Sequence, residues 1–295
     1  MSPFMVQKTL EEKKRKTKLV LEEVYSLPTM SKMVVEISKL LDDPRTNNVI
    51  LEKLISKDQG IASKVLAIAN SPLYGLRRKV STIDFAILVI GFAEMKSIVL
   101  ALAIMEALQI KSGKHFDHME YWKHSTIMGA ASRRIMEDLG FNKGGEVLTA
   151  GLLHDMGIGI IFKFFKKEFE LIYDDVYLHK IPINEAQINQ LGYTHQEIGC
   201  MICENWNLPE SLCDSILYHE NPSESKNDKL VPAVVHLADY LTQKFNIGAF
   251  YWDKGLQFDE NVLEMLHFSS MSELEDFTSS YKSLFEKELE NIKII

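Results

Sequence analysis

The sequence is dominated by segments in which apolar residues recur every three or four positions, the spacing of one face of an α-helix. Such segments follow one another along the chain, as in 31–43, 48–57 and 59–70, whereas the alternation typical of a half-buried strand is almost absent. Asp58 can cap the third segment, and Gly140 can end a long amphipathic one further on. Chains of this kind bury their apolar stripes by packing helix on helix. The predicted fold class is therefore all-α.

A polar stretch at residues 111–118 divides the predicted helices into two groups. In the first group, Gly91 lies between two strongly apolar segments and predicts a bend between buried helices. We therefore expect two helical lobes, residues 1–112 and residues 113–295, the second with a C-terminal helical extension. Residues 270–292 begin with a capping box and predict one final amphipathic helix.

The charge balance disfavours nucleic-acid binding. The 295 residues carry a formal net charge of -8, which repels polyanions unless a strong local basic surface overcomes it. The best candidate is the basic run at residues 13–18, but glutamates flank it at helical spacings. This pattern is typical of a solvated helix face with internal charge pairs. Helices 9–25 and 271–293 are then possible docking surfaces for a protein partner, on amphipathic grounds.

Compartment signals favour the cytoplasm. The N-terminus lacks a short apolar core followed by a cleavage site, and the apolar stretch Phe85–Ala93 is too short to cross a membrane. Three cysteines fit a reducing compartment. Cys200 and Cys203 form a C-x-x-C pair, but Cys213 alone cannot complete a four-ligand zinc site. We expect buried helical cysteines, a cytoplasmic protein and no membrane contact.

The second lobe gathers groups that bind transition metals. Imidazole suits Zn, Fe, Ni and Mn, and a carboxylate can bind one ion or bridge two. The chain offers two sets of such groups, each at or within a predicted helix. They are His124, His154, Asp155 and Asp239 for one ion, and His195, His219 and perhaps Glu220 for a second.

His154 and Asp155 are adjacent, and adjacent helical residues point about 100° apart. They can converge on an ion only at a helix break, for which Gly157 and Gly159 are the obvious places. The alternative is that Asp155 caps the helix that begins near Met156.

His124 and Asp239 could also have ordinary structural roles. Beside Trp122, His124 could be a hydrogen-bonded core histidine. Asp239 lies on an apolar face and needs a partner, which could be a cation, a histidine or a helix end. His236 is more easily understood as its neighbour than as a ligand.

The order H…HD…H…H…D resembles the HD superfamily of metal-dependent phosphohydrolases. The wider context resembles the HDOD domain (HD-related output domain), a non-standard branch of that superfamily. The matching stretches include LPTMSKMVVEISKLLDDP, LISKDQGIASKVLAIANSPLYGL, GLLHDMG, THQEIGCMICENWNLPESL and ILYHENP, in family order over about residues 26–245. The resemblance implies a two-lobed helical fold in a bacterial signalling protein, usually an output or regulatory module without demonstrated catalysis. By that comparison this chain keeps all six metal-type residues, a set that many HDOD members have lost in part.

Two departures from the catalytic pattern weigh against hydrolysis. Ile158 stands where catalytic HD phosphohydrolases commonly carry a lysine that stabilises phosphoryl oxygens, a contact worth about two to three orders of magnitude in rate. After His219, the acidic, glycine-rich segment of the HD-GYP phosphodiesterases is missing, and Glu220 stands where a second histidine is frequent. Hydrolysis of cyclic di-GMP is therefore not expected.

The sequence predicts a regulatory module that binds a signalling protein or a small ligand, with a nucleotide as a candidate ligand. We expect a divalent transition metal, Fe, Mn, Ni or Zn, as one or two ions. The alternative is a metal-dependent phosphohydrolase acting on a nucleotide or another phosphate ester, with Asp155 in the catalytic role. The sequence does not predict an oligomeric state.

Overall fold

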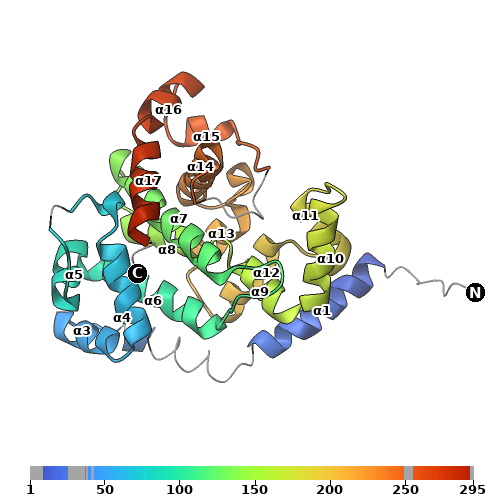
Figure 1. Cartoon of the computed structure of the whole chain (residues 1–295), viewed down its shortest axis with the longest axis horizontal. Helices are drawn as coiled ribbons and strands as arrows, with labels where there is room; N and C mark the ends of the chain where they lie inside the picture. Colours follow the sequence, from blue (N-terminus) through green and yellow to red (C-terminus); the bar gives the residue numbers. More distant parts are fainter. Residues whose placement is uncertain are drawn as a thin grey trace, which may run out of the picture.

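The computed structural model describes residues 9–25, 37, 39–40, 43–76, 78–248 and 255–292. Within these ranges all regular structure is helical, apart from an isolated bridge between Gly113 and Phe116. The predicted all-α class is confirmed (Figure 1). Most of the helix predicted at 31–43 lies outside the described residues.

The first group of helices packs around a bend at Gly91. Its described members are α3 (Asn48–Ser56), α4 (Gln59–Ala69), the short η1 (Pro72–Tyr74), α5 (Ile83–Ile90) and α6 (Phe92–Leu108). Asp58 caps α4 as predicted, because its carboxylate accepts from the Ile61 backbone N–H at 3.0 Å. Helices α5 and α6 meet at 118°, and the φ of +94° at Gly91 is one that glycine adopts readily.

The second group is built around α7 and α8, which lie closely side by side. A Cβ on Gly151 of α8 would lie 2.6 Å from the Met128 carbonyl oxygen of α7, so the absence of a side chain permits the approach. The helices of this group are α7 (His118–Asp138), α8 (Gly144–Leu153), α9 (Met156–Phe164), α10 (Lys166–Tyr177), α11 (Ile183–Leu191), α12 (His195–Asn205), α13 (Glu210–Tyr218), η2 (Pro222–Glu224) and α14 (Leu230–Phe245). Helices α8 and α14 both pack against α7, so α7 runs through the centre of the group.

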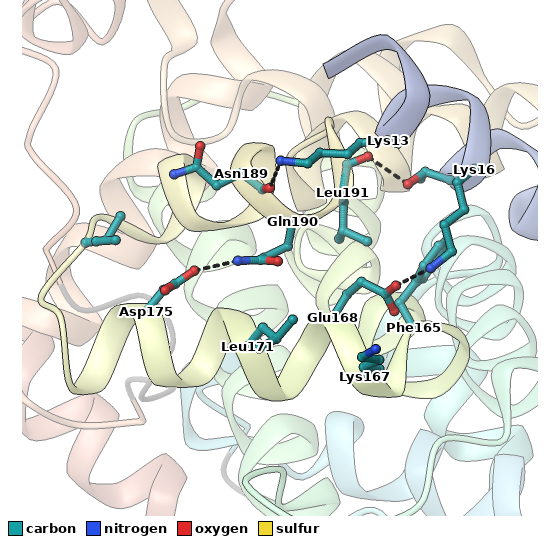
Figure 2. Close-up of a pocket in the computed structure, with 12 residues that line it drawn as sticks. Lys13, Lys16, Phe165, Lys167, Glu168, Leu171, Asp175, Asn189, Gln190 and Leu191 are labelled. Atoms are coloured by element: carbon teal, nitrogen blue, oxygen red, sulfur yellow. Dashed lines mark hydrogen bonds and ion pairs between the residues drawn. The ribbon is translucent and has the colours of Figure 1, made fainter. Parts of the chain in front are cut away.

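The N-terminal helix α1 (Leu10–Tyr25) packs one side against α11 and α12, whereas Arg15, Lys16 and Lys18 of its basic run are exposed, as predicted. Buried Thr17 donates a hydrogen bond to the Leu191 carbonyl at 2.7 Å. Lys13 donates to the Asn189 carbonyl at 2.5 Å, and Lys16 pairs with Glu168 of α10. A groove of about 490 Å³ lies among α1, α10 and α11 (Figure 2). Two lysines of the basic run therefore contact other helices.

The C-terminal extension consists of three helices, α15 (Asn261–Met265), α16 (Met271–Thr278) and α17 (Tyr281–Ile292). The prediction of one continuous helix over 270–292 is therefore wrong. Helix α17 packs against η1 and α7, and its buried Glu288 accepts a hydrogen bond from the Ser71 hydroxyl at 2.5 Å. Helix α1 lies against helices of the second predicted lobe, and α17 lies against η1 of the first. The division into two lobes at residue 112 stays a prediction.

One stretch, Gly144–Phe164, has the length and composition of a membrane span, and 83% of its most apolar window is buried inside the protein. Helices α5 and α6 together meet the same test only as a sharply bent pair. Buried core helices commonly have such compositions.

Candidate metal centre

The chain between α8 and α9 breaks at the His154–Asp155 pair itself. His154 immediately follows α8 and Asp155 immediately precedes α9, but the Asp155 side chain makes no capping hydrogen bond. The capping alternative is therefore not what the structure shows. The break was predicted at Gly157 and Gly159, but it lies before both of them.

Gly157 has a different role from the one predicted. A Cβ at this position would lie 1.9 Å from the His195 carbonyl oxygen, so glycine allows α9 to lie directly against the start of α12. The close approach brings His195 to the His154–Asp155 break.

The six predicted ligands converge on one buried centre. His124 comes from the middle of α7, His195 begins α12, His219 ends α13 and Asp239 lies on α14. Together with His154 and Asp155 they are 0–2% exposed. Helices far apart in the sequence therefore contribute to one polar pocket inside an apolar core.

Asp155 stands between two sets of imidazoles. Its Oδ2 lies 3.4 Å from His154 Nε2 and 3.6 Å from His124 Nε2. Its Oδ1 lies 3.3 Å from His195 Nε2 and 3.6 Å from His219 Nε2. Two ligand atoms about 2.0–2.2 Å from a shared ion lie roughly 3.0–3.5 Å apart, depending on geometry. One histidine of each set lies within this range of a carboxylate oxygen and the other lies 0.1 Å beyond it, so each oxygen is placed near a different pair of imidazoles.

The other carboxylates complete the two sets. Ligand atoms of His124, His154 and Asp239 lie within 4.8 Å of one another, as do those of His195, His219 and Glu220. The Glu220 side chain is 16% exposed, and its Oε1 lies 3.7 Å from His195 Nε2. Ligand atoms of His154, Asp155 and His219 meet the same spacing, so the two sets adjoin each other.

Each of the four imidazoles is oriented by a hydrogen bond at its other nitrogen. Nδ1 of His124, His154 and His219 lies 2.8–2.9 Å from a backbone carbonyl oxygen. Nδ1 of His195 lies 3.0 Å from Gln187 Oε1. Since a carbonyl oxygen can only accept, Nδ1 carries the proton and Nε2 presents a lone pair to the centre. This is the usual arrangement of histidines that ligate metals.

Several acceptor atoms of the centre are arranged as ligands of a cation would be. The Nε2 atoms of His124 and His154 face each other at 3.1 Å, and in the neutral tautomers set by their Nδ1 contacts both are acceptors. Both Asp155 carboxylate oxygens and His195 Nε2 are buried without a hydrogen-bond partner in the described part of the chain. Buried polar atoms are rarely left so. The donor set therefore fits a divalent transition metal.

Electrostatics agree with this fit at His124, His154 and His219, whose burial lowers their pKa, whereas the Asp155 carboxylate raises the pKa of His195 against the effect of burial. Burial lowers the pKa of His154 and of His219 to about 4, which keeps both imidazoles neutral and able to ligate. Burial, reinforced by the charges of Asp155 and Glu220, raises the pKa of Asp239 well above its ordinary value. A cation among these carboxylates would stabilise the ionised form of Asp239.

Two residues, Gln187 and His236, form hydrogen bonds with the candidate ligands but do not belong to the ligand groups themselves. Gln187 on α11 accepts from both the backbone N–H (2.8 Å) and Nδ1 of His195. Sequence reasoning missed Gln187, because it lies in a segment without metal-type motifs. His236 Nδ1 donates to the His219 carbonyl at 2.9 Å, and its Nε2 accepts from the Asp259 backbone N–H. His236 is thus a neighbour of the ligands, as expected.

The remaining candidates lie elsewhere. Cys200, Cys203 and Cys213 are buried free thiols and belong to none of the ligand groups found among the described residues. Ile158 is buried in α9 and supplies neither charge nor donor.

The geometry can be compared with known proteins. The HDOD domain model matches residues 27–222, about two thirds of the chain. The chain belongs to the HDOD domain family.

A curated relative, an uncharacterized protein from Treponema pallidum (strain Nichols), is 22% identical over 97% of this chain. The match covers 56% of that relative, so the HDOD chain described here spans little more than half of its length.

Solved structures share the fold. An HDOD domain protein of unknown function from Geobacter sulfurreducens is 25% identical, with a TM-score of 0.77 over 96% of this chain and 99% of that one. A Shewanella amazonensis SB2B protein, provisionally described as a phosphohydrolase, is 19% identical, with a TM-score of 0.69 over 92% and 97% of the two chains. A Marinobacter aquaeolei VT8 protein, provisionally described as a signal transduction protein, is 18% identical, with a TM-score of 0.67 over 98% and 67%.

Proposed function

We propose that this HDOD protein is a bacterial signalling module that acts by binding a partner protein or a small ligand and holds one or two divalent transition metal ions. The observation that carries the metal site is the Asp155 carboxylate, each oxygen of which faces Nε2 atoms of a separate histidine pair. His124, His154 and Asp239 would hold one ion, and His195, His219 and Glu220 the other. Fe, Mn, Ni and Zn all suit such ligands.

The signalling interpretation is favoured over catalysis because the centre lacks a cation of its own chain at position 158. The bound ions would supply Lewis acidity and an activated water. Asp155 would hold them from between the two sets, and the backbone carbonyls and Gln187 orient the imidazoles. None of these groups carries a positive charge that could pair with a phosphoryl oxygen.

The second candidate function is a metal-dependent phosphohydrolase acting on a nucleotide or another phosphate ester. It is favoured by the position of Asp155, since a carboxylate between two ions is a recurrent feature of two-metal hydrolytic sites. Asp155 would then be a catalytic residue.

Metal analysis of the purified protein tests the proposal. We expect one or two equivalents of transition metal in the wild type and a large loss in Asp155→Asn, which keeps the shape but removes the charge. Asp214→Asn is the matched control, because Asp214 is a buried carboxylate bonded to Ser225 outside the centre. Equal metal contents in the wild type and Asp155→Asn contradict the site.

Two further assays separate the candidate functions. A pull-down from source cells should recover a signalling partner with the wild-type protein. A screen of nucleotides and other phosphate esters, with Asp155→Ala as control, tests hydrolysis. Turnover that this substitution abolishes would overturn the preference for a non-catalytic module.

A further inference from the structure

A cleft of about 550 Å³ adjoins the metal centre. The connection between α10 and α11, the chain after α13 and the segment 255–257 form its walls. Glu220 lines this cleft and also belongs to the ligand group of His195 and His219. The volume lies within the range of roughly 300–1,000 Å³ typical of small-molecule sites.

The cleft combines one positive charge with several amide groups. Lys180 is the sole cation and Glu220 the sole anion among the described residues that line it. The amides belong to Asn184, Asn221 and Gln257. An anionic oxygen of a bound ligand would pair with the Lys180 ammonium group.

Asn184 links the cleft to the centre. Its Nδ2 donates to Glu220 Oε2 at 2.5 Å, while its Oδ1 is buried without a partner in the described part of the chain. An unsatisfied buried acceptor next to a metal-type carboxylate indicates a bound group with a donor, such as a hydroxyl.

Lys180 is held in a defined backbone conformation. Its φ of +60° lies in the left-handed region, which residues other than glycine adopt infrequently. Two backbone hydrogen bonds flank it: His179 N–H donates to the Asp174 carbonyl, and Ile181 N–H donates to the Asp175 carbonyl. The turn thus fixes the point at which the lysine leaves the chain, at the wall of the cleft.

We propose that this cleft binds a phosphate ester of a small organic alcohol, with the Lys180 ammonium group bound to the phosphate. Val176, Ile181 and Leu256 offer apolar contacts to the organic group. The inference rests on the metal site of the proposed function, because an ion next to Glu220 is needed to offset its repulsion of a phosphate.

Isothermal titration with phenylphosphonate, a probe that cannot be hydrolysed, tests the inference on the Mn²⁺-loaded full chain. Lys180→Met keeps much of the aliphatic stem and should weaken binding by about tenfold or more, as expected for a lost charge-assisted hydrogen bond. Lys180→Arg keeps the charge and should restore most of the affinity. Lys57→Met is the matched control, because Lys57 is also an exposed lysine and lies just after α3, away from the cleft.

Metal content and phenylphosphonate affinity are measured on the same samples. The inference predicts wild-type metal content in all lysine variants, weak binding only in Lys180→Met, and loss of binding when the metal is chelated. Normal metal content with no phenylphosphonate binding, or with equal binding by both methionine variants, overturns the cleft assignment and leaves the metal site standing. A wild-type protein that takes up no metal overturns both.

Discussion

Substitution of Gly157 by alanine tests how closely α9 must approach α12. The alanine Cβ would lie 1.9 Å from the His195 carbonyl oxygen, whereas ordinary contact begins near 3.4 Å. The two helices must therefore separate by about 1.5 Å, the difference between these distances. Overpacking of this kind costs about 1–3 kcal/mol of stability.

The sign of the effect is informative. Alanine within a helix is usually more stable than glycine by about 0.5–1 kcal/mol, so without the close approach Gly157→Ala would stabilise the protein. The separation also carries His195 Nε2 from 3.3 Å to roughly 4.8 Å from Asp155 Oδ1, beyond the roughly 3.5 Å expected for two ligands of one ion. We expect lower stability together with loss of the ion held by His195.

Urea denaturation of the metal-free protein and metal stoichiometry of the loaded protein measure the two effects. Gly144→Ala is the control, because Gly144 begins α8 and the nearest atom to its added Cβ is 3.6 Å away. That variant should match or exceed the stability of the wild type and keep all its metal. Unchanged or increased stability in Gly157→Ala would refute the packing argument.

Three further predictions concern residues around the centre and the termini. Burial raises the pKa of Glu288 from 4.5 to about 7 despite its hydrogen bond from Ser71. Between these two pH values the folded state binds more protons than the unfolded state. The free energy of unfolding should therefore fall by about 3 kcal/mol as the pH rises from 4.5 to 7. Denaturation at pH 4.5 and 8 should show this loss in the wild type but not in Glu288→Gln, and parallel profiles would contradict it. Gln187→Leu removes the acceptor behind His195 and should weaken metal binding by about 10–100-fold in a chelator competition, with Gln187→Glu less affected; equal affinities would exclude this role. Thr17→Val leaves a buried carbonyl of α11 without its donor and should cost about 1–3 kcal/mol in urea denaturation, and no loss would show that α1 is not anchored there.

The sequence identified the residues that could ligate a metal, but not the residues that pack against them and orient them. His124, His154 and Asp239 come together because helices of an all-α fold carry them inward, and the family resemblance supplied their order. The structural role of Gly157 could not be predicted, because it depends on a contact with His195, which is distant in the sequence. Gln187 carried no motif for the same reason: its role depends on where α11 meets α12.

The helix errors have similar causes. Between α16 and α17 the chain turns at Ser279–Ser280, where neither glycine nor proline signals a break. The basic run of α1 is largely exposed, as its pattern predicted, but the contacts of Lys16 with Glu168 and of Lys13 with the Asn189 carbonyl could not be foreseen, because these partners lie on distant helices. Local patterns show which residues can be polar and exposed, but not which other helix will cover them.

Anomalous diffraction from crystals of the Mn²⁺-loaded protein tests the central claim most directly. We predict one or two peaks next to the Asp155 carboxylate, one on the side of His124 and His154 and one on the side of His195 and His219. Loaded protein whose only manganese peaks lie away from Asp155 would contradict the account.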